Sequence, residues 1–190
     1  MNKIIWPLLL CAVLCGCGRG ETGNAVQEQY STLETARLEA EVTSHTSTDS
    51  RTFTLLCSYD ADGDAVTTVT APGELAGLTA VVSGTDMTLS SEGLQLPAGA
   101  SLDICPANCL PYLLRALADG YVLEQSSEAL DNTPCLRLAL DTTAPGGGKV
   151  LCAVWLDAEG LFPRYAEFSR NEQVVLTVKL LAFTCTTSEG

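Results

Sequence analysis

The sequence predicts a mainly β domain: an antiparallel sheet of about ten strands, with one helix before it and one helix inserted into it. Polar and apolar residues alternate over long stretches, as in residues 36–43, where Leu38, Ala40 and Val42 are separated by charged or polar neighbours. A period of two is typical of a strand with one face on the core. Short turns rich in Gly, Asp and Asn separate these stretches. An antiparallel sheet of this size has to curl to cover its apolar face.

The first 16 residues are set apart from the domain because they read as a lipoprotein signal peptide. A short positive segment precedes an apolar run over residues 4–14, which is shorter than the roughly 20 residues that a membrane-spanning helix needs. Leu14-Cys15-Gly16-Cys17 follows and resembles a bacterial lipobox, which implies cleavage before Cys17 and a lipid (diacylglycerol, palmitate) on this cysteine. An ordinary secretory signal with chance cysteines, or an uncleaved anchor, are the alternatives.

With this cleavage, residues 17–24 form a lipidated linker and residues 25–190 form the folded domain. Two or more acyl chains hold a protein firmly on a membrane, so we expect an extracytoplasmic protein anchored to the cell membrane through Cys17. The chain carries 23 Asp+Glu against 10 Lys+Arg, a formal net charge of −13. This acidity excludes a nucleic-acid-binding protein, which needs clustered basic residues. It would also repel an anionic membrane surface, so the lipid alone is expected to hold the protein there.

Two helices interrupt the strand pattern. Residues 25–33 have helical composition, with apolar side chains at helical spacing. Residues 106–119 form the clearest helix, because leucines recur at i, i+3, i+4 and i+7 and Gly120 ends the pattern. Such a leucine stripe is usual in a core, and a helix that lies across an open sheet needs one too. Besides residues 36–43, the expected strands are 52–59, 65–70, 78–82, 87–90, 94–96, 121–125, 136–140, 149–156, 162–169 and 174–184.

One acidic turn suggests a calcium site. Asp60, Asp62 and Asp64 surround Gly63. A calcium loop of the EF-hand type needs glycine at its sixth position and glutamate at its twelfth, whereas here glycine is fourth and Ala71 is twelfth. Asp and Gly are also the residues of a tight hairpin. We therefore predict a hairpin at this point and no metal site.

Six cysteines remain in the domain once the signal is removed. An even number outside the cytoplasm permits up to three disulfides. Cys105 and Cys109 are the candidate pair, since residues i and i+4 share a helix face. Free thiols that pack as small apolar side chains in strands are the alternative. A metal site built on this pair has no nearby His or Cys partner, so we expect neither metal nor cofactor. The six are Cys57, Cys105, Cys109, Cys135, Cys152 and Cys185.

Three segments resemble the LolA/LolB-like family. Residues 150–157, 161–168 and 174–183 share its pattern, in which a strand that ends in a Leu-Asp turn meets a Leu-x-Pro start of the next strand. Residues 70–78 and 92–94 resemble the lipoprotein branch in Gram-positive bacteria, which includes germination lipoproteins. The resemblance implies a half-open antiparallel β-barrel of about 10–11 strands, with the N-terminal helix and the inserted helix plugging its mouth.

The resemblance also implies a function, because members of the family carry or sense acyl chains in the concave face of the sheet. We expect a membrane-anchored lipoprotein that binds a lipid or other hydrophobic ligand there. The alternative is a protein-interaction scaffold or chaperone-like partner at the cell surface, in germination or envelope assembly. The residues expected to line the concave face are Leu113, Leu114, Leu117, Trp155, Phe168, Leu176 and Val178, and simple filling of the core by the same side chains stays open.

Catalysis is not expected. His45 is the single histidine of the chain and lies at the polar end of a strand. The carboxylates lie in turns or on alternating strand faces, as solvated residues do. No Ser/His/Asp or Cys/His arrangement is assignable with one histidine, so the sequence predicts no catalytic residue.

Overall fold

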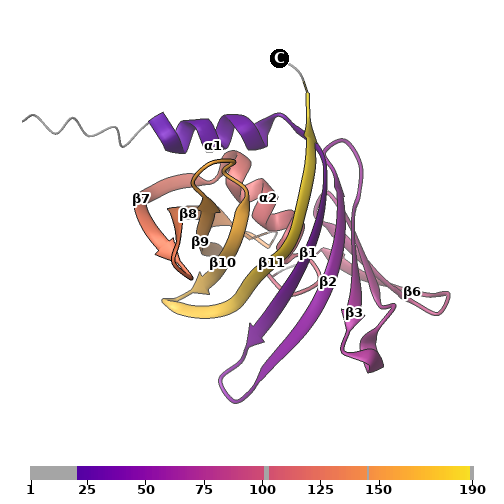
Figure 1. Cartoon of the computed structure of the whole chain (residues 1–190). Helices are drawn as coiled ribbons and strands as arrows, with labels where there is room; N and C mark the ends of the chain where they lie inside the picture. The colour runs from indigo at the N-terminus through magenta and orange to yellow at the C-terminus, as the bar shows by residue number, and fades with distance from the viewer. Residues whose placement is uncertain (1–20, 101–102, 145, 189–190) are drawn as a thin grey trace, which may run out of the picture.

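The computed structural model describes residues 21–100, 103–144 and 146–188. These residues form one open antiparallel sheet of 11 strands with two α-helices (Figure 1). The predicted fold class, a mainly β half-open barrel with an N-terminal and an inserted helix, is confirmed. The predicted signal peptide, Cys17 and the linker residues up to 20 lie outside the described residues.

The elements are α1 (Glu21–Ser31), β1 (Leu33–His45), β2 (Ser50–Asp60), β3 (Ala65–Ala71), the 3-10 helix η1 (Gly73–Leu75), β4 (Thr79–Ser83), β5 (Asp86–Ser91), β6 (Leu94–Ala100), α2 (Cys109–Asp119), β7 (Tyr121–Leu130), β8 (Thr133–Thr143), β9 (Lys149–Asp157), β10 (Pro163–Arg170) and β11 (Gln173–Thr187).

Strand β1 divides the sheet into two halves. On one side β2, β3, β4, β5 and β6 follow in order, and on the other side β11, β10, β9, β8 and β7 follow in order. Neighbouring strands are also neighbours in sequence, except for the pair of β1 with β11, so hairpins build both halves. The connection from β6 to β7 joins the two outer edges of the sheet and contains α2. We call the two parts the β2–β6 half and the β7–β11 half.

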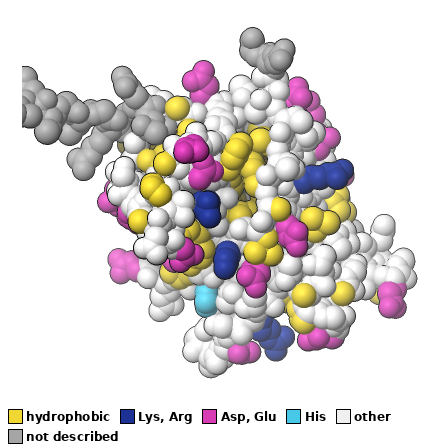
Figure 2. Space-filling view, viewed as in Figure 1, with side chains coloured by type: hydrophobic (Ala, Val, Ile, Leu, Met, Phe, Trp, Pro, Cys, Tyr) yellow, Lys and Arg dark blue, Asp and Glu magenta, His cyan; other side chains and the backbone are white. Residues whose placement is uncertain are grey.

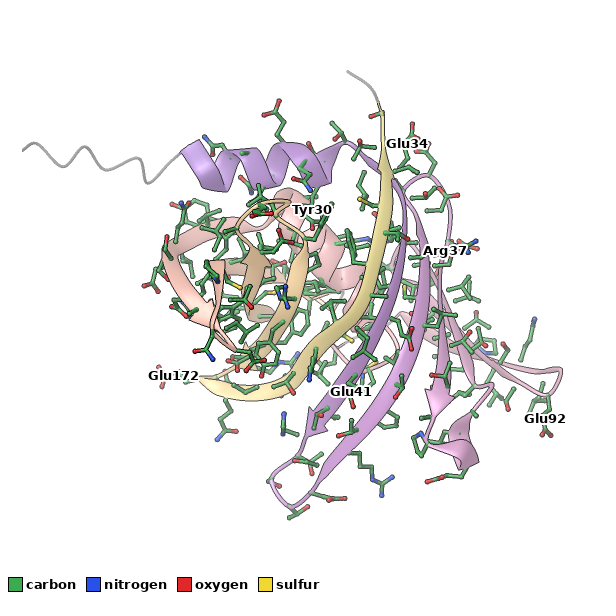
Figure 3. All side chains as sticks on the ribbon, viewed as in Figure 1. Tyr30, Glu34, Arg37, Glu41, Glu92 and Glu172 are labelled. Carbon is green, nitrogen blue, oxygen red and sulfur yellow. The ribbon has the colours of Figure 1, made fainter. Side chains whose placement is uncertain are left out.

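The alternation that predicted β1 correctly separates its buried side chains from its exposed ones. Leu38, Ala40 and Val42 are buried, whereas Arg37 and Glu41 are exposed on the outer face (Figure 3). The strand pairs with β2 on one side and with β11 on the other over most of its length. A half-buried strand at the centre of a curved sheet explains the strict period of two.

Two hairpins show where turn chemistry sets the strand ends. The Asp60 turn joins β2 to β3 as predicted, and the Asp62 backbone N–H donates to Asp60 Oδ1 at 3.1 Å. Asp131 and Asn132 both have positive φ, at 50° and 63°, in the turn between β7 and β8. Two such residues form the type I′ turn that matches strand twist. Strand β7 therefore continues to Leu130, beyond the predicted end at residue 125.

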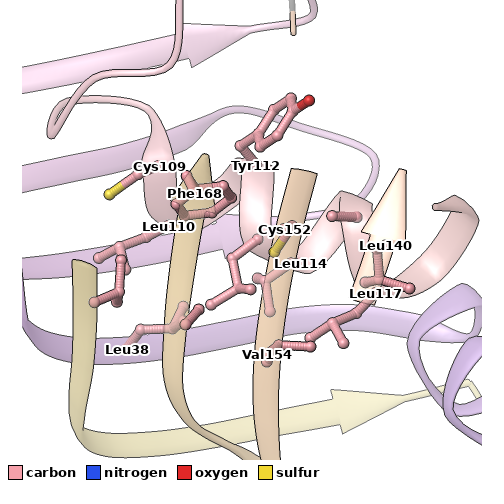
Figure 4. Packing of buried hydrophobic residues seen from close by; sticks show 14 of the residues in the cluster. Leu38, Cys109, Leu110, Tyr112, Leu114, Leu117, Leu140, Cys152, Val154 and Phe168 are labelled. Atoms are coloured by element: carbon pink, nitrogen blue, oxygen red, sulfur yellow. The ribbon is translucent and has the colours of Figure 1, made fainter. Parts of the chain in front are cut away.

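Helix α2 packs its leucines into the concave face of the β7–β11 half (Figure 4). It begins at Cys109, three residues after the predicted start, because residues 105–108 form a separate turn. Within this turn the N–H groups of Asn108 and Cys109 both donate to the Cys105 carbonyl, at 3.1 and 3.0 Å. The helix ends as predicted, where the Gly120 N–H donates to the Ala116 carbonyl at 2.9 Å and the chain becomes extended.

Helix α1 covers one end of the curved sheet, and its bounds differ from the predicted 25–33. Leu33 is buried as the first residue of β1, so the helix ends two residues earlier than predicted. The Tyr30 hydroxyl donates to the Leu161 carbonyl at 3.1 Å, and Gln29 Nε2 donates to the Gly160 carbonyl at 3.1 Å. These bonds tie α1 to the turn between β9 and β10.

Candidate functional site

The side chains predicted to line a ligand groove are mostly brought together, but they pack against one another. Leu113, Leu114 and Leu117 of α2 are at most 1% exposed, and so are Phe168, Leu176 and Val178 of the facing strands. All six belong to one continuous core cluster. They fill the concave face of the β7–β11 half, which agrees with the alternative reading of these residues as core.

Trp155 is the exception and lies on the opposite, outer face of the sheet. It alternates along β9 with Val154 and Leu156, which are buried, so its own side chain has to point outward. Its indole Nε1 donates to Glu128 Oε2 at 2.9 Å, and the Arg137 guanidinium lies 5.3 Å from its ring centre. Inclusion of Trp155 in the concave face was therefore wrong, because the strand period places it on the other side.

The concave face of the β2–β6 half contains a cleft of about 170 Å³. Strands β2 to β5 form its floor and walls, and the turn over residues 105–107 covers one side. Among the described residues, no charged side chain lines it. The lining residues are Phe53, Leu55, Thr67, Val69, Leu75, Leu78, Ala80, Leu89, Cys105, Pro106 and Ala107.

Strand register explains why these residues meet. Leu55 pairs with Val69, Thr67 pairs with Ala80, and Ala80 pairs with Leu89. Directly opposed residues share a face of an antiparallel sheet, so four strands contribute to one apolar surface. Only small or medium side chains lie at the centre of this surface. The space above them therefore stays open, whereas α2 fills the corresponding space in the β7–β11 half.

This surface continues beyond the cleft onto the outermost strand. Leu96 pairs with Leu89 of the cleft wall, and Leu94 lies two residues from Leu96 on the same face of β6. Leu94 and Leu96 are 63% and 58% exposed. The hairpin of β5 and β6 projects from the body of the domain, with Glu92 at its turn (Figure 3). An apolar cleft therefore opens onto an uncovered apolar face.

The turn that covers the cleft is held in place by buried polar contacts. Asn108 is 2% exposed; its Oδ1 accepts from the Cys105 N–H at 2.8 Å and its Nδ2 donates to the Asp103 carbonyl at 2.8 Å. The Asp103 carboxylate pairs with Arg170 at the end of β10, where Nη1 lies 2.7 Å from Oδ2. The segment thus bridges the two halves of the sheet. Buried polar groups that are fully bonded hold a segment in one conformation.

The floor of the cleft carries one hydroxyl and, next to it, one thiol. Thr67 of β3 lies directly opposite Cys57 of β2. Burial raises the pKa of the Cys57 thiol to about 11, although the neighbouring Thr67 hydroxyl acts in the opposite direction. The thiol is therefore protonated at neutral pH. The cleft presents no charge to a ligand, which suits an apolar group and disfavours an ion.

The six cysteines of the domain are free thiols in the structure. Cys109 Sγ donates to the Pro106 carbonyl at 3.5 Å, and burial raises the pKa of both Cys105 and Cys109. The two are not bonded to each other, and a disulfide between them stays a prediction for the oxidised protein. Among the described residues, no group of three or more His, Cys, Asp or Glu side chains is arranged to hold a metal ion.

His45 lies at the end of β1, as predicted, among hydroxyl groups. Its Nδ1 is 3.1 Å from Ser50 Oγ and its Nε2 is 3.3 Å from Thr177 Oγ1. Within the described part of the chain, neither a carboxylate nor a thiol bonds to this ring. The geometry provides no orienting group of the kind that a general base uses.

Sequence reasoning missed the cleft because it placed the concave site on the long apolar helix and the C-terminal strands. A signal was present in the earlier hairpins. Phe53, Leu55 and Cys57 alternate along β2, and Ala65, Thr67 and Val69 alternate along β3. Apart from Phe53, these side chains are small or medium, and paired in register they predict an apolar face with no bulky residue at its centre. That space could be inferred only once the path of α2 was known.

In the described part of the chain, no helix has the length and apolar character needed to span a membrane.

Comparison with known proteins gives matches in structure only. No family model matches the chain, and no curated protein matches its sequence. A DUF1329 family protein from Desulfovibrio piger aligns over 90% of this chain and 94% of its own, at 12% identity and a TM-score of 0.54. An uncharacterized conserved protein from Thermus thermophilus aligns over 88% and 90%, at 8% identity and a TM-score of 0.54. A LolA superfamily protein from Nitrosomonas europaea aligns over 88% and 94%, at 12% identity and a TM-score of 0.47. The first two matches show that the whole fold occurs in other proteins.

Proposed function

We propose that this chain is an extracytoplasmic lipoprotein that binds the apolar chain of a lipid in the cleft of the β2–β6 half. One observation carries the proposal: an uncharged cleft opens onto an apolar face of β5 and β6 that no other described element covers. The lipid anchor on Cys17, and residence at the outer side of the cell membrane, belong to the same proposal and rest on the lipobox.

The size of the cleft suits the end of an acyl chain. An apolar cavity of about 150 Å³ in a protein core is large enough to bind benzene, and this cleft measures about 170 Å³. The rest of a longer chain would lie along Leu89, Leu96 and Leu94. Each buried methylene contributes about 0.8 kcal/mol, so several methylenes suffice for binding without a polar contact.

The proposal gives the sequence-predicted residues a different role. Leu113, Leu114 and Leu117 support the shape of the sheet from within the filled half and would not touch a ligand in the cleft. Membership of the LolA/LolB-like family, and of its Gram-positive lipoprotein branch, is part of the proposal and rests on the motifs in residues 150–183 and 70–94. The absence of a catalytic role stays a prediction.

A fluorescent fatty acid tests the proposal with the mature chain. We expect saturable binding, and Leu89→Glu should weaken it at least about tenfold, because a carboxylate in the cleft would be desolvated by the ligand. Leu123→Glu is the matched control, since Leu123 is 54% exposed on β7 at the other edge of the sheet.

Native mass spectrometry of the protein purified from membranes gives a second readout. Lipid retained by the wild type and lost from Leu89→Glu supports the proposal. Equal affinity in the two variants, or no saturable binding by the folded wild type, overturns it. Thermal melting of each variant confirms that the fold is intact.

A further inference from the structure

Strand β11 extends past the point where its pairing with β10 stops, and a seam opens there. They pair from Arg170 and Gln173 up to Tyr165 and Lys179. Beyond this point β11 continues to Thr187 while paired only with β1. The β7–β11 half is therefore joined to β1 through β11, but no strand of the described chain lies on the other side of residues 180–187.

The free side of this segment is a row of backbone groups. In an antiparallel strand the N–H and C=O groups of successive residues point alternately to the two neighbours. About half of those in residues 180–187 therefore point away from β1. Among the described residues, the pairing with β10 reaches no further along β11 than Lys179. Such a row is a template for pairing with another extended chain.

The seam is also a groove of about 440 Å³. Figure 2 shows hydrophobic side chains at the surface between β10 and β11, with basic side chains beside them. The Phe183 ring packs 5.4 Å from the Phe162 ring and forms part of the floor. The groove is lined by Leu130, Asp131, Pro163, Arg164, Tyr165, Lys179, Leu180, Leu181, Ala182 and Phe183.

The charges of the seam differ from those of the whole chain. Arg164 and Lys179 line it, and neither forms an ion pair within the described part of the chain. Asp131 is the single carboxylate in the lining. Within this lining two basic residues stand against one carboxylate, and Glu41 of β1 lies directly opposite Lys179. Exposed basic residues beside a docking surface attract a partner of opposite charge.

We propose that the seam binds an extended acidic segment of a partner protein, which adds as a strand to residues 180–187 of β11. Backbone hydrogen bonds supply the affinity in this mode of recognition, and side chains on alternate positions supply the specificity. Apolar side chains of the segment would face Phe183 and Leu180, and its carboxylates would meet Arg164 and Lys179. The site lies apart from the lipid cleft, so the two proposals stand independently.

A short synthetic peptide that alternates Val and Glu tests the inference with the mature protein. When the peptide saturates, alternate backbone amides in residues 180–186 should exchange hydrogen at least about tenfold more slowly, because they gain strand hydrogen bonds. The double variant Arg164→Glu and Lys179→Glu should weaken binding at least about tenfold. Arg51→Glu removes a basic residue at the start of β2, away from the seam, and should change the affinity little.

Two control peptides separate strand addition from simple charge attraction. The same sequence with N-methyl groups on alternate residues cannot donate on one side and should not bind. A peptide that alternates Val and Lys should bind at least about tenfold more weakly. Equal binding of the N-methylated peptide, protection outside β11, or no binding of the acidic peptide at millimolar concentration overturns the inference. A fatty acid that protects the same amides also overturns it, since the seam would then be a lipid site.

Discussion

The two halves of this sheet curve around the same space and use it differently. In the β7–β11 half, α2 and large side chains such as Phe168, Leu138 and Leu140 fill the concave face completely. In the β2–β6 half the corresponding face carries Ala65, Thr67 and Ala80, and a cleft remains. The halves have similar numbers of strands and the same hairpin connections. Side-chain volume and the path of one helix decide which half is core and which is open.

This difference teaches that a single curved sheet can separate stability from binding. Fully buried leucines contribute most when they are close-packed, so the filled half holds the domain together. The open half is free to keep an apolar surface uncovered, because its strands are held by pairing to β1. The following experiments test that division, from the largest expected effect to the smallest.

Leucine truncation compares the halves directly. Leu114→Ala in the filled half should lower the free energy of unfolding by about 2–5 kcal/mol, because it leaves a cavity in a packed core. Leu96→Ala in the open half should lower it by less than about 0.5 kcal/mol, since this side chain is already exposed. Urea unfolding measures both. Equal losses would show that the two halves are packed alike.

The Cys57 thiol lies at the boundary of the halves, paired with Leu38 of β1 and with Thr67 of β3. Burial raises its pKa to about 11, whereas an unfolded cysteine titrates near pH 8.5. The folded state therefore holds this proton more tightly. Its contribution is fully present below about pH 8.5 and is lost as pH rises through 11, which amounts to roughly 2 kcal/mol by pH 10.

Cys57→Ala provides the control for this pH dependence. Other groups ionise in the same range, so the quantity of interest is the difference between the two proteins. The free energy of unfolding of the variant should fall less steeply between pH 8.5 and pH 10. Parallel curves for the two proteins would show that this thiol is not buried.

Asn108 holds the turn that covers the cleft. Asn108→Ala removes the bonds to Cys105 and Asp103 and should lower the free energy of unfolding by about 1–2 kcal/mol. Hydrogen exchange in residues 103–108 should accelerate, while exchange in the α2 core stays slow. Asn108→Asp keeps the acceptor for the Cys105 N–H but turns a carboxylate oxygen toward the Asp103 carbonyl, so it should destabilise the protein at least as much as Asn108→Ala. An unchanged exchange rate would mean that the turn is held by packing alone.

The ion pair of Asp103 with Arg170 should have the smallest effect. Both side chains are partly exposed, so Arg170→Ala should lower the free energy of unfolding by no more than about 1 kcal/mol. The loss should shrink further in high salt. Arg51→Ala is the matched control, because its pair with Asp49 is more exposed and less tightly formed. A large loss would indicate that bridging of the two halves stabilises the whole sheet.

Much of the fold follows from the sequence, and the site follows much less. The period of two in β1 and the turn at Asp60 depend on neighbouring residues, so both are predictable locally. The leucine stripe of α2 predicts a buried helix but not which half of the sheet it fills. Trp155 shows the same limit: its size suggests a core residue, and only its register in β9 places it outside. The cleft exists because α2 and large side chains do not fill the concave face of the β2–β6 half, and a local sequence pattern does not predict that.

The outer edges of the sheet differ from the seam in a way that bears on assembly. On β6, Pro97 lacks a backbone donor, and on β7 the carboxylates of Glu124 and Glu128 would meet their own copies in an edge-to-edge pair. Residues 180–184 of β11 contain neither a proline nor a charged residue that would prevent strand pairing. A strand that adds to this segment would lie beside the turn between β9 and β10, where the Phe162 ring packs 5.4 Å from the Phe183 ring. Of the strand edges in the described part of the sheet, this segment of β11 is the one that stays open to an added strand.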